Sequence, residues 1–129
     1  MKKILVAEDN NLILETINQK LTRDGYEVIK SKNGQECLSF LRNNTVDLLI
    51  TDLYMPYLNG NEIISALRNE LRLNFPILVL SADGAEDTVL KAFELGADDY
   101  VVKPFSLSEL SIRVKKLLLT NAGFQSSAS

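Results

Sequence analysis

The sequence lacks the residues on which several common kinds of site depend. It has no histidine, no tryptophan and a single cysteine, Cys37, among 129 residues. One cysteine has no partner for an intramolecular disulfide and cannot build a Cys-rich metal site. The 14 basic and 17 acidic residues give a net charge of -3, which offers no electrostatic reason to hold nucleic acid. These shortages favour a reducing cytoplasm and no direct binding to nucleic acid.

Long apolar runs are also missing. No stretch approaches the roughly 20 apolar residues that are needed to cross a membrane. Residues 1–3 and the apolar segment 4–7 begin like a signal peptide, but Glu8 and Asp9 end that segment too early. We therefore expect a soluble, unexported protein that does not bind membranes. Its 46% hydrophobic and 24% charged residues suit one globular domain with one core.

Short aliphatic segments alternate with amphipathic ones from Lys3 to about Leu119, which indicates a parallel sheet with connecting helices. Five strands are expected at residues 4–7, 26–31, 46–51, 77–80 and 100–102. The predicted fold is a doubly wound α/β sandwich, because right-handed crossovers place the five helices on both faces of the sheet. Residues 1–120 are the predicted domain, and residues 121–129 are expected to be a flexible tail or a truncated linker.

Local signals mark several helix ends. The first and fourth helices are expected to end at Gly25 and Gly96, because glycine readily adopts the left-handed conformation found at helix C-termini. The start signals are Asn33 for the second helix, Gly60 just before the third, Asp83 with Glu86 for the fourth, and a Ser106 and Glu109 capping box for the fifth. The third helix is expected to carry Ile63, Ile64, Leu67 and Leu71 on one face.

Polar side chains follow four of the five predicted strands. The first strand ends in Glu8 and Asp9, the third in Asp52, the fourth in Ser81 and the fifth in Lys103. Taken singly, each has an ordinary explanation, such as helix capping, a local turn contact or a solvated lysine. Ligands of open parallel sheets, however, bind beyond the carboxyl ends of the strands. Because capping alone does not explain acids, a hydroxyl and a lysine at one edge, the set predicts a functional site.

The chemistry of this set indicates phosphoryl transfer. Three clustered carboxylates repel one another, so they need a hard divalent cation, for which Mg²⁺ is the obvious candidate. The charges of Glu8, Asp9, Asp52, Lys103 and the ion sum to zero, which lets a doubly negative phosphoryl donor approach. Asp52 would attack phosphorus, the metal and Lys103 would stabilise charge on the transferred oxygens, and Ser81 would donate to a third oxygen.

Four motifs carry a resemblance to a known family. They are ILVAEDN at residues 4–10, DLLITDLYMPYLNG at 47–60, ILVLSA at 77–82 and GADDYVVKPFSLSEL at 96–110. With them the chain resembles the receiver domain of two-component response regulators from Lys3 to about Leu119. The resemblance implies a flavodoxin-like, doubly wound five-stranded parallel sheet with strand order 2-1-3-4-5 and five helices.

The resemblance also implies a role for each matching residue. Asp52 is the implied phosphoacceptor, Asp9 a direct metal ligand, Glu8 a support of the metal through water, and Tyr54 a ligand through its backbone carbonyl. Lys103 is the implied phosphate-contacting lysine, Ser81 the switch hydroxyl, Tyr100 the switch aromatic and Pro104 the second residue of a cis peptide bond. Tyr54 and Asp83 occupy positions that tune how fast the phosphoryl group hydrolyses.

The implied partner is a sensor histidine kinase or a histidine phosphotransfer protein. The donor histidine must come from another protein or domain, because this chain has none. As a receiver, the chain would catalyse only its own phosphorylation and dephosphorylation, and would remodel the face of the fourth helix, fifth strand and fifth helix to control an output such as transcription. The charges on that face are Lys91, Glu94, Asp98, Asp99, Arg113 and Lys116. They fit a phosphorylation-dependent homodimer or an ordinary solvated surface.

Three rival functions are weaker on the residues. A magnesium-dependent phosphohydrolase with an Asp52 nucleophile usually carries a second acid two residues later, where this chain has Tyr54. A receiver that binds partners constitutively normally lacks the acids or the lysine, which are all present. A flavin or nucleotide site needs a glycine-rich loop after the first strand, where Glu8 and Asp9 place negative charge instead.

Overall fold

The computed structural model describes the backbone of residues 1–128 and the side chains of residues 1–120. The last helix is described as far as Ala128, but the side chains of the expected tail at 121–129 lie outside the described residues. The tail or linker therefore stays a prediction. None of the described helices combines the length and the apolar composition that crossing a membrane requires.

Five strands form one parallel sheet in the order β2-β1-β3-β4-β5. They are β1 (Lys3–Ala7), β2 (Glu27–Ser31), β3 (Leu48–Thr51), β4 (Ile77–Ser81) and β5 (Asp99–Val102). The predicted sheet and its strand order are confirmed. The largest change in bounds is at β3, which begins at Leu48 rather than at Val46.

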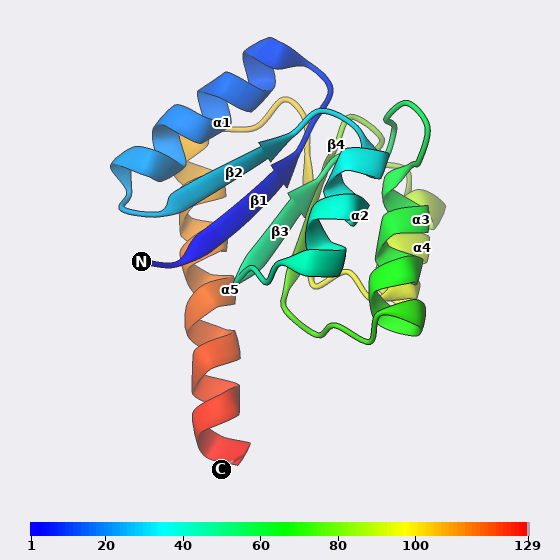
Figure 1. The fold of residues 1–129 in the computed structure, drawn as a ribbon. Helices are drawn as coiled ribbons and strands as arrows, with labels where there is room; N and C mark the ends of the chain where they lie inside the picture. Colours follow the sequence, from blue (N-terminus) through cyan, green and yellow to red (C-terminus); the bar gives the residue numbers. More distant parts are fainter. Residues whose placement is uncertain (129) are drawn as a thin grey trace.

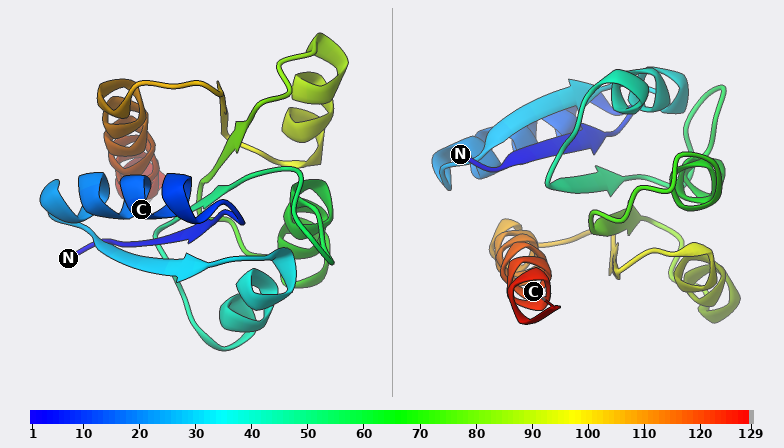
Figure 2. Two further views of the ribbon diagram at one scale, coloured as in Figure 1. Left: turned by 90° about the horizontal axis from the view of Figure 1, so that it is seen from above. Right: turned by 60° about the horizontal axis from the view of Figure 1, so that its bottom comes forward.

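The helices cover both faces of the sheet. They are α1 (Asn11–Arg23), α2 (Gly34–Asn43), α3 (Gly60–Ser65), the π-helical segment η1 (Ala66–Glu70), α4 (Glu86–Leu95) and α5 (Leu107–Ala128). Figure 1 shows α1 and α5 on one side of the sheet and α2, α3 and α4 on the other. The two further views in Figure 2 keep this three-layer arrangement. This arrangement, with helices on both faces of one parallel sheet, is the predicted doubly wound sandwich.

Side chains that alternate along a strand pack into two separate cores, one on each face of the sheet. In β1, Ile4 and Val6 pack with the apolar side chains of α1 and α5, whereas Leu5 and Ala7 pack with those of α2 and α3. Because helices cover both faces, the strands are nearly continuous apolar runs rather than alternating ones. Each fully buried aliphatic side chain contributes about 1.5–3 kcal/mol relative to an exposed one, so both layers are firmly held. Cys37 is free and buried in α2.

The third helix is not the single regular helix that its apolar spacing predicts. Regular α-helix ends at Ser65, and the backbone amide of Leu71 donates to the carbonyl of Ala66 at 2.9 Å, five residues back. Next to this wider turn Leu67 is fully buried, and the guanidinium of Arg68 donates to the carbonyls of Leu73 and Phe75 in the loop that follows. No glycine or proline in η1 signals the change.

The fourth helix begins later than the acidic pair Asp83 and Glu86 suggests. Glu86 is its first residue, and the extended residue before it is Ala85, which makes no side-chain cap. Asp83 lies outside the helix, where its Oδ1 accepts from the amide of Ala85 at 3.0 Å. The predicted stop at Gly96 is confirmed, because this residue has a φ of 121° and its amide bonds back into the helix.

A glycine at the start of α3 makes room for the end of β3. A Cβ at Gly60 would lie 2.4 Å from the carbonyl oxygen of Asp52 and 2.8 Å from the Cα of Leu53. The amide of Gly60 also donates to the carbonyl of Leu53 at 2.8 Å. The close approach of these backbones fixes the loop that follows Asp52.

We therefore predict that Gly60→Ala lowers the free energy of unfolding by about 1–3 kcal/mol, since backbone rather than a flexible side chain must move. Urea unfolding measures the change, and Ser65→Ala in the same helix is the control, with an expected loss of about 0.5 kcal/mol or less. A Gly60→Ala protein as stable as the wild type would contradict this packing.

Candidate functional site

Three carboxylates gather at the carboxyl edge of the sheet. Oxygens of Glu8, Asp9 and Asp52 lie within 4.8 Å of one another. Glu8 and Asp52 are only 2% and 8% exposed, whereas Asp9 faces solvent. The cluster thus joins two buried acids to one that a ligand can reach from outside.

The register of β1 and β3 brings these acids together. Ala7 pairs with Thr51, so the next residue of each strand, Glu8 or Asp52, leaves the sheet at the same level. Neither Glu8 nor Asp9 caps α1, because Asn10 does so by accepting from the amide of Ile13 at 3.1 Å. Asn10 is not among the predicted residues; its backbone amide also donates to Oε2 of Glu8 at 3.1 Å, which helps to orient that acid.

Lys103 bridges the two buried acids from the end of β5. Its Nζ lies 2.7 Å from Oε1 of Glu8 and 2.9 Å from Oδ2 of Asp52. The peptide bond from Lys103 to Pro104 is cis. One ammonium group therefore contacts acids that come from two different strands.

Burial and the contacts of Lys103 shift the pKa values of Glu8 and Lys103 in opposite directions. Burial is the largest influence on the pKa of Glu8 and raises it, although the hydrogen bond from Lys103 opposes the rise. For Lys103, burial lowers the pKa, but the hydrogen bonds to Glu8 and Asp52 together outweigh it, so the pKa is raised overall. Lys103 therefore remains a cation between the two acids at neutral pH.

Both carboxylate oxygens of Asp52 have hydrogen-bond donors. Oδ2 accepts from Lys103, while Oδ1 accepts from the backbone amide of Leu53 at 2.7 Å and of Tyr54 at 3.4 Å. The two amides belong to the loop between β3 and α3, which the bond from the amide of Gly60 to the carbonyl of Leu53 holds in place. The carboxylate is thus fixed in orientation.

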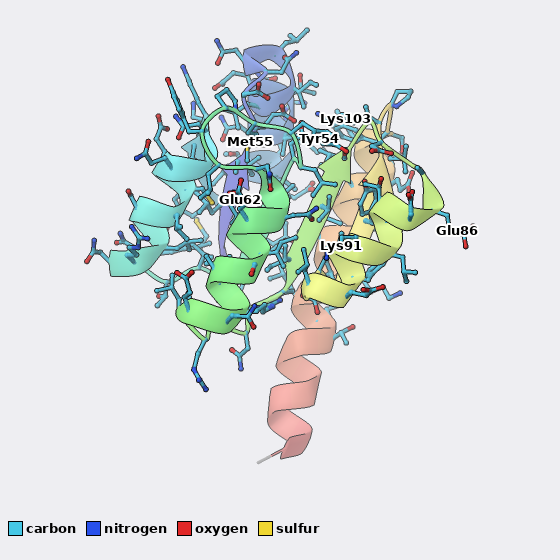
Figure 3. All side chains as sticks on the ribbon, turned by 90° about the vertical axis from the view of Figure 1, so that its right-hand side faces the viewer. Tyr54, Met55, Glu62, Glu86, Lys91 and Lys103 are labelled. Carbon is cyan, nitrogen blue, oxygen red and sulfur yellow. The ribbon has the colours of Figure 1, made fainter. Side chains whose placement is uncertain are left out.

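The remaining predicted residues meet at Asp83 rather than at the acids. Ser81 is fully buried, and its Oγ accepts from the amide of Asp83 at 3.2 Å. The hydroxyl of Tyr100 donates to the backbone carbonyl of Asp83, and the hydroxyl of Tyr54 donates to Oδ2 of Asp83 at 2.6 Å. Burial raises the pKa of Tyr100. In Figure 3, Tyr54 and Lys103 lie at the same end of the sheet.

Comparisons with known proteins agree with this geometry. The family model described as the response regulator receiver domain matches residues 4–115. The alkaline phosphatase synthesis transcriptional regulatory protein PhoP of Bacillus subtilis is 42% identical over 117 residues, which cover 91% of this chain and 48% of that protein. The chain therefore spans about half the length of this curated relative.

Two solved structures show the same fold. The receiver domain of the Francisella response regulator 1452 matches with a TM-score of 0.89 and 34% identity, covering 94% of this chain and 99% of that one. The response regulator TrrA of Thermotoga maritima, solved in complex with Mg²⁺ and BeF, matches with a TM-score of 0.81 and 36% identity, covering 91% and 99%.

The Lys103 bridge generates a stability prediction. Lys103→Met leaves the buried Glu8 beside Asp52 without a cation, so the free energy of unfolding should fall by about 2 kcal/mol near neutral pH. The loss should shrink as the pH falls toward about 5, because a carboxyl whose pKa is raised in the folded state favours folding once it is protonated.

Urea unfolding with a chelator at both pH values measures this effect. Lys30→Met is the matched control, because Lys30 contacts the exposed Glu15 at 2.7 Å on the surface. We expect its loss to stay at about 0.5 kcal/mol or less at either pH. Equal losses in the two variants would show that the bridge does not compensate buried charge.

Proposed function

The chain belongs to the response regulator receiver domain family, and we propose that Asp52 is the residue that accepts its phosphoryl group. The observation that carries the proposal is the contact of Lys103 with both Asp52 and Glu8, beside Asp9. It joins a fixed carboxylate nucleophile, a cation for the incoming oxygens and further acids for a metal ion in one pocket.

The donor set supports Mg²⁺ as the cofactor. Carboxylate and carbonyl oxygens are the ligands that hard cations prefer. We propose that Asp9 and Asp52 hold the ion directly, Glu8 supports it through water, and the backbone carbonyl of Tyr54 adds a ligand. When bound, Mg²⁺ stabilises negative charge on the oxygens of the transferred group. The relative TrrA, solved with Mg²⁺ and BeF, supports this choice.

The residues of the chain then complete the transfer. An oxygen of Asp52 forms a bond to phosphorus as the bond from phosphorus to the donor nitrogen breaks, so no water is consumed. The ammonium group of Lys103 exchanges its hydrogen bond to Asp52 for one to a phosphoryl oxygen, and the hydroxyl of Ser81 donates to a second phosphoryl oxygen. The later hydrolysis of the acyl phosphate is the only other reaction that the proposed function needs.

The donor is proposed to be the phosphohistidine of a sensor kinase or a phosphotransfer protein in the cytoplasm. An open groove beside Lys103 supports docking of such a partner. It is lined mainly by apolar side chains, including Leu12, Ile13, Pro104 and Phe105. An apolar rim at the pocket mouth lets a protein surface exclude water while its histidine reaches Asp52.

The output is proposed to be a homodimer that forms through α4, β5 and α5 and acts on transcription. Exposed apolar side chains on these elements support it, namely Leu90, Phe93, Val102 and Ile112. Arg113 already bonds Asp99 at 2.9 Å within the chain, and Arg68 bonds Asp98 at 2.9 Å. Three of the six charges expected on this face, Asp98, Asp99 and Arg113, therefore have partners inside the monomer.

The phosphoacceptor is tested with acetyl phosphate and Mg²⁺. Intact-mass analysis should find one added phosphoryl group on the wild type and on the control Asp87→Asn, and none on Asp52→Asn. Asp9→Asn should be phosphorylated at least about tenfold more slowly, because a metal ligand is lost. Equal labelling of Asp52→Asn, or turnover of a chromogenic phosphate ester, would falsify the assignment in favour of another acceptor or a phosphohydrolase.

The dimer is tested by sedimentation with beryllofluoride and Mg²⁺ at a protein concentration on the order of tens of micromolar. We expect a monomer without the ligand and a dimer with it. Phe93→Asp should remain monomeric, because it places a charge in the apolar patch. Leu12→Asp, at an exposed position on α1, should still dimerise. A wild type that stays monomeric with beryllofluoride excludes this output.

A further inference from the structure

A groove runs between α2 and α3, which lie side by side on one face of the sheet (Figure 1). It has two overlapping parts, one along α3 with a volume of about 540 Å³ and one beside Tyr57 with about 450 Å³. The apolar side chains of Leu38 and Leu58 line both parts. None of the residues of the phosphorylation pocket lines either part, so the groove is a separate feature of the surface.

Opposite charges line this groove without pairing. Arg42, in the last turn of α2, is exposed and lines both parts, whereas Glu62 and Glu70 line the part along α3. None of the ion pairs within residues 1–120 joins the arginine to either acid. Glu62 already accepts from the amide of Asn59 at 3.0 Å, so Glu70 is the freer acid. A ligand between these side chains can therefore bind both charges through an anionic and a cationic group of its own.

A polar atom without a partner belongs to the same groove. Within the described part of the chain, Oδ1 of Asn61 is the one buried side-chain nitrogen or oxygen that makes no hydrogen bond. Buried polar groups are nearly always paired, so the exception needs an explanation. Asn61 lines the part along α3 and is half-buried, which leaves its side chain room to turn. Turned toward the groove, this oxygen is an acceptor for a cationic group.

Tyr57 lines the part of the groove that has no acids, and its conformation is unfavourable. Its φ of 72° lies in the left-handed region, which residues other than glycine rarely adopt. The residue is 83% exposed, so packing within the chain does not compensate this strain. Strain that the fold does not explain points to a function. The exposed ring, next to Leu38 and Leu58, offers an apolar surface to a ligand.

These features fit one class of ligand. We propose that the groove between α2 and α3 binds a small zwitterion with an apolar body, such as an aromatic or aliphatic amino acid. Its carboxylate pairs with Arg42, its ammonium group binds Glu70 and the oxygen of Asn61, and its side chain packs on Leu58 and Tyr57. A simple anion is repelled by the acids and a simple cation by the arginine, so a ligand that carries both charges is favoured.

Binding is tested by titrating the whole chain with L-phenylalanine or L-leucine, in the presence of a chelator, while NMR follows the backbone amides. Signals of residues 35–42 and 57–70 should shift and saturate with a Kd on the order of 1 mM, as suits a small ligand in an open groove. Phenylalaninamide lacks the carboxylate and N-acetylphenylalanine lacks the ammonium group. Each should bind at least about fivefold more weakly than phenylalanine.

Two substitutions test the assignment of the charges. Arg42→Met should weaken the binding of phenylalanine at least about fivefold and leave that of phenylalaninamide unchanged, because the lost contact is the one to the carboxylate. Glu70→Gln should likewise weaken phenylalanine and leave N-acetylphenylalanine unchanged. Arg23→Met is the matched control, because Arg23 is exposed in the last turn of α1, and it should bind like the wild type.

Three results overturn the proposal. They are the absence of saturable shifts at 35–42 and 57–70 with either amino acid up to about ten times the expected Kd, equal binding of phenylalanine and its two derivatives, and an Arg42→Met protein that still prefers phenylalanine to its amide. The titration uses neither metal nor phosphate, so its outcome is independent of whether Asp52 accepts a phosphoryl group.

Discussion

The contact of one lysine with two buried acids is the interaction on which the rest of this site depends. Lys103 leaves β5 at the edge of the sheet, yet its ammonium group reaches Glu8 after β1 and Asp52 after β3. Buried acids at this spacing repel one another and are costly without a cation. The strand order, the register of β1 against β3 and the close approach at Gly60 all serve to bring these three groups together.

The sequence was sufficient for the architecture and for the meeting of four polar side chains at one edge of the sheet. Nearly continuous apolar segments ending in polar residues predict strands covered on both faces, and the parallel arrangement then aligns their carboxyl ends. Glu8, Asp9, Asp52 and Lys103 were predicted to meet for this reason, and they do. These inferences used local patterns and one general rule of sheet geometry, whereas the strand order was implied by the resemblance to receiver domains.

What could not be predicted depends on contacts between side chains that are distant in sequence. Asp83 and Glu86 look like a helix start, but the partner of Asp83 is Tyr54, which lies 29 residues earlier. The wide turn of η1 likewise follows from tertiary contacts of Arg68 and Leu67 and not from a helix-breaking residue. Asn10 and Asn59 are detectable omissions, because an Asn just before an apolar helical repeat is a strong N-cap signal, and Asn59 forms a capping box with Glu62.

The polar contacts at the two ends of α4 differ in how deeply they are buried. At the pocket edge, Tyr54, one partner of Asp83, is 59% exposed, so water can replace its hydroxyl and the cost of breaking this bond is small. At the opposite edge, Arg68 serves carbonyls from two loops in a largely buried position, and no other donor replaces it without rearrangement. Only Ala92 of α4 is buried, so the polar contacts at the two ends of this helix, one exposed and one largely buried, have a large share in holding it.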